Sequence, residues 1–127
     1  GRFMITDKMK ELLTEYAKTL VKGGSFHGAS ISAGSAKVGL GGNSTSPAAI
    51  DIDVPNGAAT TISAEKTTTN VLQLFVEVLG QNIQGEVIRE MGVFDSAGNL
   101  LTRINFDGVG PFSTTERLQI YLTLEVE

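Results

Sequence analysis

The chain has 127 residues, of which 41% are hydrophobic and 19% charged, and this length and composition fit one globular domain with a core of its own. Its formal net charge of −4 supplies no basic face for nucleic acid, so no nucleic-acid partner is expected. The absence of cysteine excludes disulfides and thiolate chemistry, and no apolar run approaches the roughly 20 residues of a membrane span, so no membrane insertion is expected.

Residues 7–22 are predicted to form the single helix of the chain, because apolar side chains recur there at spacings of three and four. Thr6 or Asp7 suits the N-terminal cap, and Gly23 and Gly24 end the helix. The apolar stripe needs a packing partner, which is either the sheet of the same chain or a neighbouring subunit. The stripe consists of Met9, Leu12, Leu13, Tyr16, Ala17 and Leu20.

Three strands are predicted in the middle of the chain, which is rich in Gly, Ser and Thr. A short apolar alternation covers residues 36–40. In residues 49–54, Ile and Val alternate with Asp51 and Asp53, which predicts a second strand. The Thr-rich residues 60–66 show a weaker alternating pattern, which predicts a third strand.

The strand predicted at residues 70–79 is apolar on both faces. One face is wholly aliphatic, and the other carries an apolar stripe beside Gln73 and Glu77. Such a strand is either central in a sandwich or covered by the helix or by a partner. The first face holds Leu72, Leu74, Val76 and Val78, and the second holds Val71, Phe75 and Leu79.

Three further strands are predicted at residues 87–94, 100–106 and 118–126. Asp95 and Gly98 suit a type I turn closed by a bulge, which makes the first two strands a hairpin. The last strand alternates apolar and polar residues without a slip, so one of its faces is buried. The expected core comprises Leu72, Leu74, Val76, Val78, Ile88 or Met91, Leu118, Ile120, Leu122 and Leu124.

Structural roles are also predicted for three residues within the hairpin. Glu90 and Arg103 lie on its two arms and are expected to pair across it, and an exposed cross-strand ion pair contributes about 0.2–1 kcal/mol. Gly92 lies inside a strand, which indicates a bulge or the close approach of another backbone or side chain.

The hairpin and the last strand resemble the C-terminal half of small virion proteins of tailed phages, found among tail-fibre and tail-collar-fibre-like proteins. The segment IREMGVFDSAGNLLTRINF is similar to that family's I-x-E-x-G-L-F-D-x-x-G-x-L-L-A-R hairpin, and TTERLQIYLTLEV is similar to its closing strand. The loop between them departs from the family, which usually has Pro-Ile-Thr-Lys where this chain has Gly-Pro-Phe-Ser, and residues 36–47 resemble the family more loosely. The matching positions are Ile88, Glu90, Gly92, Phe94, Asp95, Gly98, Leu100, Leu101 and Arg103.

No catalytic or ligand-binding constellation is recognised, so no enzymatic activity, cofactor or metal is expected. His27 is the single histidine and is interpreted as a surface or partly buried residue. Asp51 and Asp53 are interpreted as a solvated strand face, because no calcium-loop spacing surrounds them. Glu86 and Glu90 share a strand face, but a chain with no tryptophan and two tyrosines offers little for a sugar cleft.

The sequence therefore predicts one domain, residues 1–127, with a mainly β fold. It should be an antiparallel β-sandwich of six to eight strands at about residues 31–127, with one N-terminal α-helix at about residues 7–22. Residues 1–3 are interpreted as a cloning remnant ahead of a natural start at Met4, with proteolytic trimming as the alternative.

The resemblance implies a non-enzymatic structural component of a tailed-phage or phage-like virion, such as a fibre, fibre-base, collar or capsid-decoration part. Its partners would be copies of itself, with a homotrimer favoured by the resemblance to fibre-like proteins, and other virion proteins. The alternative is a small recognition module that binds a carbohydrate or a host receptor through Gly-, Ser- and Thr-rich loops. The candidate interface residues are Val71, Phe75 and Leu79 on the strand and Met9, Leu13 and Tyr16 on the helix.

Overall fold

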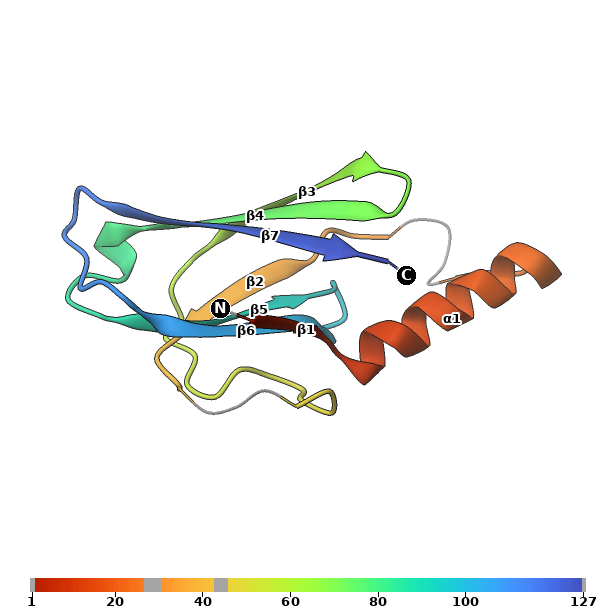
Figure 1. The fold of residues 1–127 in the computed structure, drawn as a ribbon, viewed down its shortest axis with the longest axis horizontal. Coiled ribbons are helices and arrows are strands. Elements are labelled where there is room, and N and C mark those ends of the chain that lie inside the picture. Colours follow the sequence, from red (N-terminus) through yellow and green to blue (C-terminus); the bar gives the residue numbers. More distant parts are fainter. Residues whose placement is uncertain (1, 27–30, 43–45, 127) are drawn as a thin grey trace.

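The computed structural model of the chain describes residues 2–26, 31–42 and 46–126. The elements are, in chain order, β1 (Arg2–Ile5), α1 (Asp7–Lys22), β2 (Ser35–Gly39), β3 (Thr61–Thr68), β4 (Val71–Leu79), the 3₁₀ turn η1 (Gly80–Asn82), β5 (Ile88–Phe94), β6 (Leu100–Val109) and β7 (Arg117–Glu125). Sheet A has the order β1-β6-β5-β2, and sheet B has the order β3-β4-β7. All strand pairs are antiparallel, and the two sheets face each other (Figure 1). The predicted mainly β sandwich with one N-terminal helix is confirmed.

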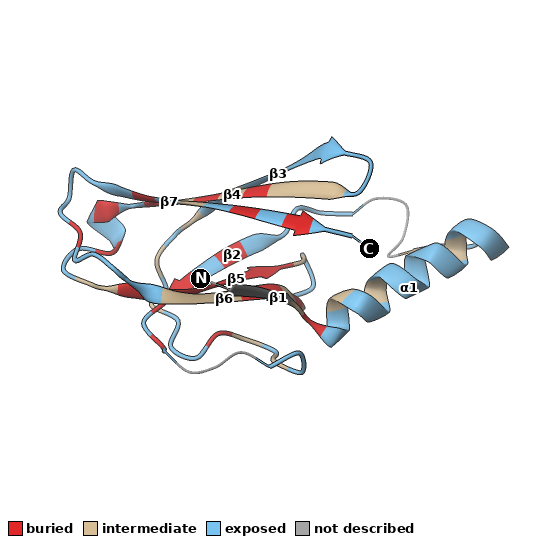
Figure 2. Cartoon of the chain, in the orientation of Figure 1, coloured by how far each residue is buried: buried red, intermediate tan, exposed pale blue. Residues whose placement is uncertain are grey.

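The hydrophobic core lies between the two sheets, where buried residues of β4, β5 and β7 face one another (Figure 2). Burial of these aliphatic side chains supplies the main stabilisation of the fold, at about 25 cal/mol for each Å² of apolar surface. Of the predicted core, Leu72 and Ile120 are only half-buried. The other predicted positions are all buried: Leu74, Val76, Val78, Ile88, Met91, Leu118, Leu122 and Leu124.

Sheet A includes a strand N-terminal to the helix, β1, which was not predicted from the sequence. β1 pairs with β6, in a register that runs from Arg2 opposite Asn105 to Ile5 opposite Thr102. The sandwich therefore recruits a strand that lies outside the predicted range 31–127, and this strand includes part of the segment 1–3 that was interpreted as a cloning remnant. Four residues are too short a stretch for a strand period to be recognised.

Helix α1 starts at a cap that also ties it to sheet A. The Thr6 side chain accepts a hydrogen bond from the Met9 N–H at 3.2 Å, which identifies Thr6 as the N-cap. Its hydroxyl lies 2.5 Å from the Leu100 carbonyl oxygen, and its own N–H donates to the Leu101 carbonyl oxygen at 3.0 Å. The buried Thr6 thus ties the start of the helix, where the chain leaves β1, to the neighbouring strand β6. At the other end Gly23, with φ +81°, terminates the helix as predicted.

The helix does not cover a sheet of its own chain, so the first of its two predicted packing partners is wrong. No residue of α1 is buried, and the helix runs away from one end of the sandwich (Figures 1 and 2). Met9 packs against the edge of the core, but the exposed fractions of Leu13, Tyr16 and Leu20 are 42%, 46% and 70%. The hydrogen bonds of the cap direct the axis away from both sheets, so most of the apolar stripe remains uncovered.

The strand predicted at residues 49–54 is also wrong. This part of the chain is an extended connection without regular strand pairing, and it crosses the outer side of sheet A (the yellow segment in Figure 1). Ile52 is buried against the sheet, whereas Ile50 and Val54, which share its place in the alternating pattern, are exposed. An isolated bridge between Gly39 and Pro55 joins the segment to the edge of β2. The backbone N–H groups of Asp53 and Val54 bond to one side chain of sheet A rather than to a neighbouring strand.

Candidate functional site

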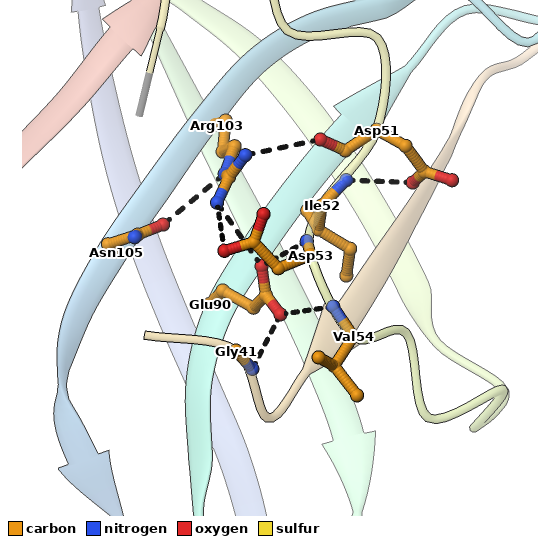
Figure 3. A network of polar contacts seen from close by, with 8 residues as sticks. All are labelled: Gly41, Asp51, Ile52, Asp53, Val54, Glu90, Arg103 and Asn105. Atoms are coloured by element: carbon orange, nitrogen blue, oxygen red, sulfur yellow. Dashed lines mark hydrogen bonds and ion pairs between the residues drawn. The ribbon is translucent and has the colours of Figure 1, made fainter. Parts of the chain in front are cut away.

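That side chain is Glu90, which points from β5 to the outer side of sheet A and is fully buried by the crossing segment (Figure 3). Glu90 Oε2 accepts hydrogen bonds from the N–H groups of Gly41 at 2.6 Å and Val54 at 2.8 Å. Glu90 Oε1 accepts a third from the Asp53 N–H at 2.7 Å. Bonds from backbone N–H groups to a carboxylate are short and strong, so one side chain holds two separate loops against the sheet.

Arg103 lies beside Glu90 on β6 and is also buried, with 4% of its surface exposed. Its Nη2 atom is 3.1 Å from Asp53 Oδ2 and 3.5 Å from Glu90 Oε1. Its other nitrogens donate to the Asp51 carbonyl oxygen and to Asn105 Oδ1, both at 3.3 Å. The predicted cross-hairpin pair is present. This pair is buried, so the small energy expected of an exposed pair does not apply. Removing either partner would leave the other as an unpaired buried charge, which is costly.

Three glycines allow the segment to approach this Glu90–Arg103 network. A Cβ atom on Gly39 or Gly41 would lie 2.8 or 2.5 Å from Glu90 Oε2. A Cβ atom on Gly92 would lie 2.9 Å from Ile52 Cγ2, so the predicted close approach at Gly92 is confirmed. The glycines are required by neighbouring atoms of the same chain, since a larger residue at any of them would clash with the crossing segment, with Glu90 or with both.

The carboxylates considered for catalysis or cation binding are engaged in the fold. Both oxygens of the buried Glu90 accept backbone hydrogen bonds, which leaves no face for a substrate. The Glu86 carboxylate accepts a hydrogen bond from the Asn56 side-chain amide at 3.0 Å. Asp51 pairs with Lys37 at 3.3 Å, and Asp53 pairs with Arg103. The arrangement positions loops, and offers no pair of free carboxylates for general acid and base chemistry.

The hairpin turn that follows β5 has the predicted geometry. The Gly98 N–H donates to the Asp95 carbonyl oxygen at 3.1 Å, and Gly98 has φ +87°. Asp95 Oδ1 accepts hydrogen bonds from the N–H groups of Ala97 and Asn99. The pairing register shifts between Val93 and Phe94, as a bulge beside the turn requires. Asp95 and Gly98 of the family-like motif therefore both serve the turn.

Gly98→Val is expected to lower the free energy of unfolding by about 1–3 kcal/mol, because a β-branched residue resists the left-handed conformation. No atom lies within 4 Å of a Cβ placed at Gly98, so a steric clash contributes nothing. Urea denaturation measures the change. The matched control is Ser96→Val in the same turn, where no positive φ is required, and equal stabilities of the two variants would contradict the turn geometry.

The predicted interface residues of the helix line an open groove against the hairpin turn. The groove has a volume of about 480 Å³ and lies between α1 and residues 95–97. Tyr16 also makes an edge-on contact with Phe26, at 5.1 Å between ring centroids. Sequence reasoning missed Phe26 and Ile31, which were taken as loop. The apolar lining residues are Met9, Leu12, Leu13, Tyr16, Phe26, Ile31, Ala97 and Leu101.

The second set of predicted interface residues lies elsewhere, on the outer face of sheet B. Phe75 contacts Tyr121 of β7 with ring centroids 4.7 Å apart, while Val71 is half-buried and Leu79 is exposed. Glu77 interrupts the apolar stripe. A hydrogen bond from Gln119, with the nearby Arg117 guanidinium, lowers the pKa of the Glu77 carboxyl below its ordinary value. The structure does not bring this face together with the helix groove, so the two candidate surfaces are separate.

The described ranges, residues 2–26, 31–42 and 46–126, contain no cluster of three His, Cys, Asp or Glu side chains that could hold a metal ion. His27 lies outside these ranges. Within them, α1 is neither long nor apolar enough to cross a membrane. Comparisons with protein-family models, with curated proteins and with solved structures find no match to this chain.

Proposed function

We propose that this chain is a structural component of a tailed-phage or phage-like virion that acts by assembling with copies of itself and with other virion proteins. The observation that carries the assembly part of the proposal is the uncovered apolar face of α1. A fibre, fibre-base, collar or capsid-decoration part is the kind of component that the sequence resemblance favours.

The stability of α1 supports assembly. The helix has 16 residues and none is buried, whereas most of the stability of a helix in a protein comes from the packing of its apolar face. Its hydrogen bonds to sheet A and its contact with the core lie at the first turn, at Thr6 and Met9. Contact between the Leu13 and Tyr16 side chains of neighbouring copies would remove apolar surface from water and stabilise the helix at the same time.

The residues that carry the family resemblance support a structural role. Glu90, Gly92 and Arg103 bind the crossing segment to sheet A, and Asp95 and Gly98 form the hairpin turn. These five motif residues are therefore accounted for by their roles in the fold. A motif of this kind is expected where a family shares a building part rather than a reaction.

Leu13→Glu is expected to convert the assembled protein to monomers, because the charge would have to be buried between copies. Leu13 is 42% exposed in the single chain, so the sandwich should keep its stability. Size-exclusion chromatography with light scattering measures the mass. The control is Thr14→Glu, which adds the same charge on the polar side of α1 and should leave the assembly intact. An unchanged mass for Leu13→Glu would contradict assembly through the helix.

The virion part of the proposal has a separate test. Mass spectrometry of particles purified from the phage or prophage that encodes the chain should detect it at a fixed ratio to the major capsid or tail proteins. Its absence from washed particles, together with a monomeric state in solution, would favour the alternative recognition module.

A further inference from the structure

The outer edge of β7 is the longest regular edge that the structure describes. Sheet B ends at β7, whose pairing in the described part of the chain is with β4 alone. That pairing runs through nine consecutive positions, from Leu79 opposite Arg117 to Val71 opposite Glu125, without a register shift. The other side of β7 therefore presents a straight row of backbone N–H and C=O groups to which a further strand could bond.

The other sheet edges carry features that discourage such pairing. β2 has five residues, and its edge is occupied by the crossing segment through the Leu40 N–H to Val54 carbonyl bond and the Asn56 N–H to Val38 carbonyl bond. β3 has a register shift after Lys66, and β1 has only four residues. Bulges, lysines, short strands and covering segments are the usual protections of a sheet edge. β7 has a continuous ladder, no proline and charges only at its two ends.

We propose that β7 pairs antiparallel with β7 of a second copy, about a two-fold axis that passes between the two Tyr121 residues. This contact deepens the proposed self-assembly and rests on it. In this register Arg117 lies opposite the second copy's Glu125, so each end of the contact places opposite charges together. On the inner face, aliphatic residues meet aliphatic residues, with Leu118 opposite Leu124 and Ile120 opposite Leu122.

The sequence of β7 selects this register over its neighbours. A shift of one residue would place the outer face of one strand beside the inner face of the other, which would expose the core row. A shift of two residues preserves the faces but separates Arg117 from Glu125 and shortens the ladder. The register centred on Tyr121 is the one in which all nine residues pair and both end charges are matched.

The contact would also extend an aromatic feature of the outer face of sheet B. Tyr121 is 65% exposed and touches Phe75, so two copies would form a continuous row of four rings across the outer face. A two-fold contact does not itself build a trimer, and it leaves the face of α1 free for a second contact.

Single cysteines test the register directly, because the chain has none of its own. Residues directly opposite in an antiparallel pair have Cα atoms about 4.5–5.5 Å apart, which suits a disulfide. Tyr121→Cys should therefore give a covalent dimer on mild oxidation, at least ten-fold faster than a matched control. The control is Ser63→Cys, which occupies the same outer-face row beside Phe75 but on β3, the opposite edge of sheet B.

A mixture of Gln119→Cys and Thr123→Cys proteins tests the same contact with Tyr121 retained. The mixture should form the 119–123 heterodimer faster than either protein forms a homodimer. Equal rates for Tyr121→Cys and Ser63→Cys, or no preference for the heterodimer, would overturn the β7 contact. If the protein is then still an oligomer that Leu13→Glu dissociates, the proposed self-assembly stands and only the β7 contact fails.

Discussion

Replacing Glu90 by glutamine is expected to lower the free energy of unfolding by about 3–5 kcal/mol, the usual cost of removing one partner of a buried ion pair. The substitution leaves Arg103 with the Asp53 carboxylate as its remaining anionic partner, at 3.1 Å. It also places an amide, which has only one acceptor oxygen, where Gly41, Asp53 and Val54 donate three hydrogen bonds. Chemical denaturation followed by far-ultraviolet circular dichroism measures the loss.

Glu86→Gln is the matched control for this substitution. Glu86 is a half-buried carboxylate near the start of β5, and it accepts a hydrogen bond from the Asn56 side chain. Glutamine retains an acceptor for that bond, so a change below about 1 kcal/mol is expected. If Glu90→Gln were as mild as Glu86→Gln, the Glu90–Arg103 network would not hold the segment to sheet A.

Leu122→Ala should cost about 2–5 kcal/mol, the range for removing a large aliphatic side chain from a packed core. Leu122 is 4% exposed and lies opposite Leu74 of β4 in the middle of sheet B. Thermal or urea unfolding measures the loss. Thr123→Ala is the control on the next residue, whose side chain is exposed on the outer face, and it should change stability by less than about 0.5 kcal/mol. Similar losses for the two variants would contradict the assignment of the two faces of β7.

The elements that could be predicted from the sequence are those whose pattern is complete within a short stretch. β7 alternates over nine residues, and α1 has both a cap and a terminating glycine. The turn at Asp95 and Gly98 has two local signals: an acceptor side chain at its first residue and a glycine, which can adopt a positive φ. Such signals depend on residues that are close together in the sequence, so they can be recognised without knowledge of the tertiary contacts.

The parts that could not be predicted depend on contacts between distant residues. The alternation at Ile50 and Ile52 resembles a strand, but the next two backbone N–H groups, of Asp53 and Val54, bond to Glu90, 37 and 36 residues away. Nothing local marks Glu90 as a buried acceptor of three hydrogen bonds. The glycines on both sides of the contact, such as Gly41 and Gly92, were the available signal, since they permit a close approach.

The direction of α1 was likewise beyond local reasoning. Its amphipathic pattern correctly predicts an apolar face, but the pattern is the same whether that face meets a sheet or another subunit. The tie between Thr6 and the carbonyl groups of Leu100 and Leu101 decides where the helix points. Of the six predicted interface residues, three line the helix groove and three lie on sheet B, so the sequence identified apolar surfaces without showing that they are separate.

The most direct test of the proposed self-assembly is the mass of the unmodified protein in solution, measured by light scattering across a range of concentrations. The uncovered face of α1 predicts a stable oligomer, with a mass that is a fixed multiple of the 13.4 kDa chain and that persists on dilution. A clean monomer at high concentration would contradict it.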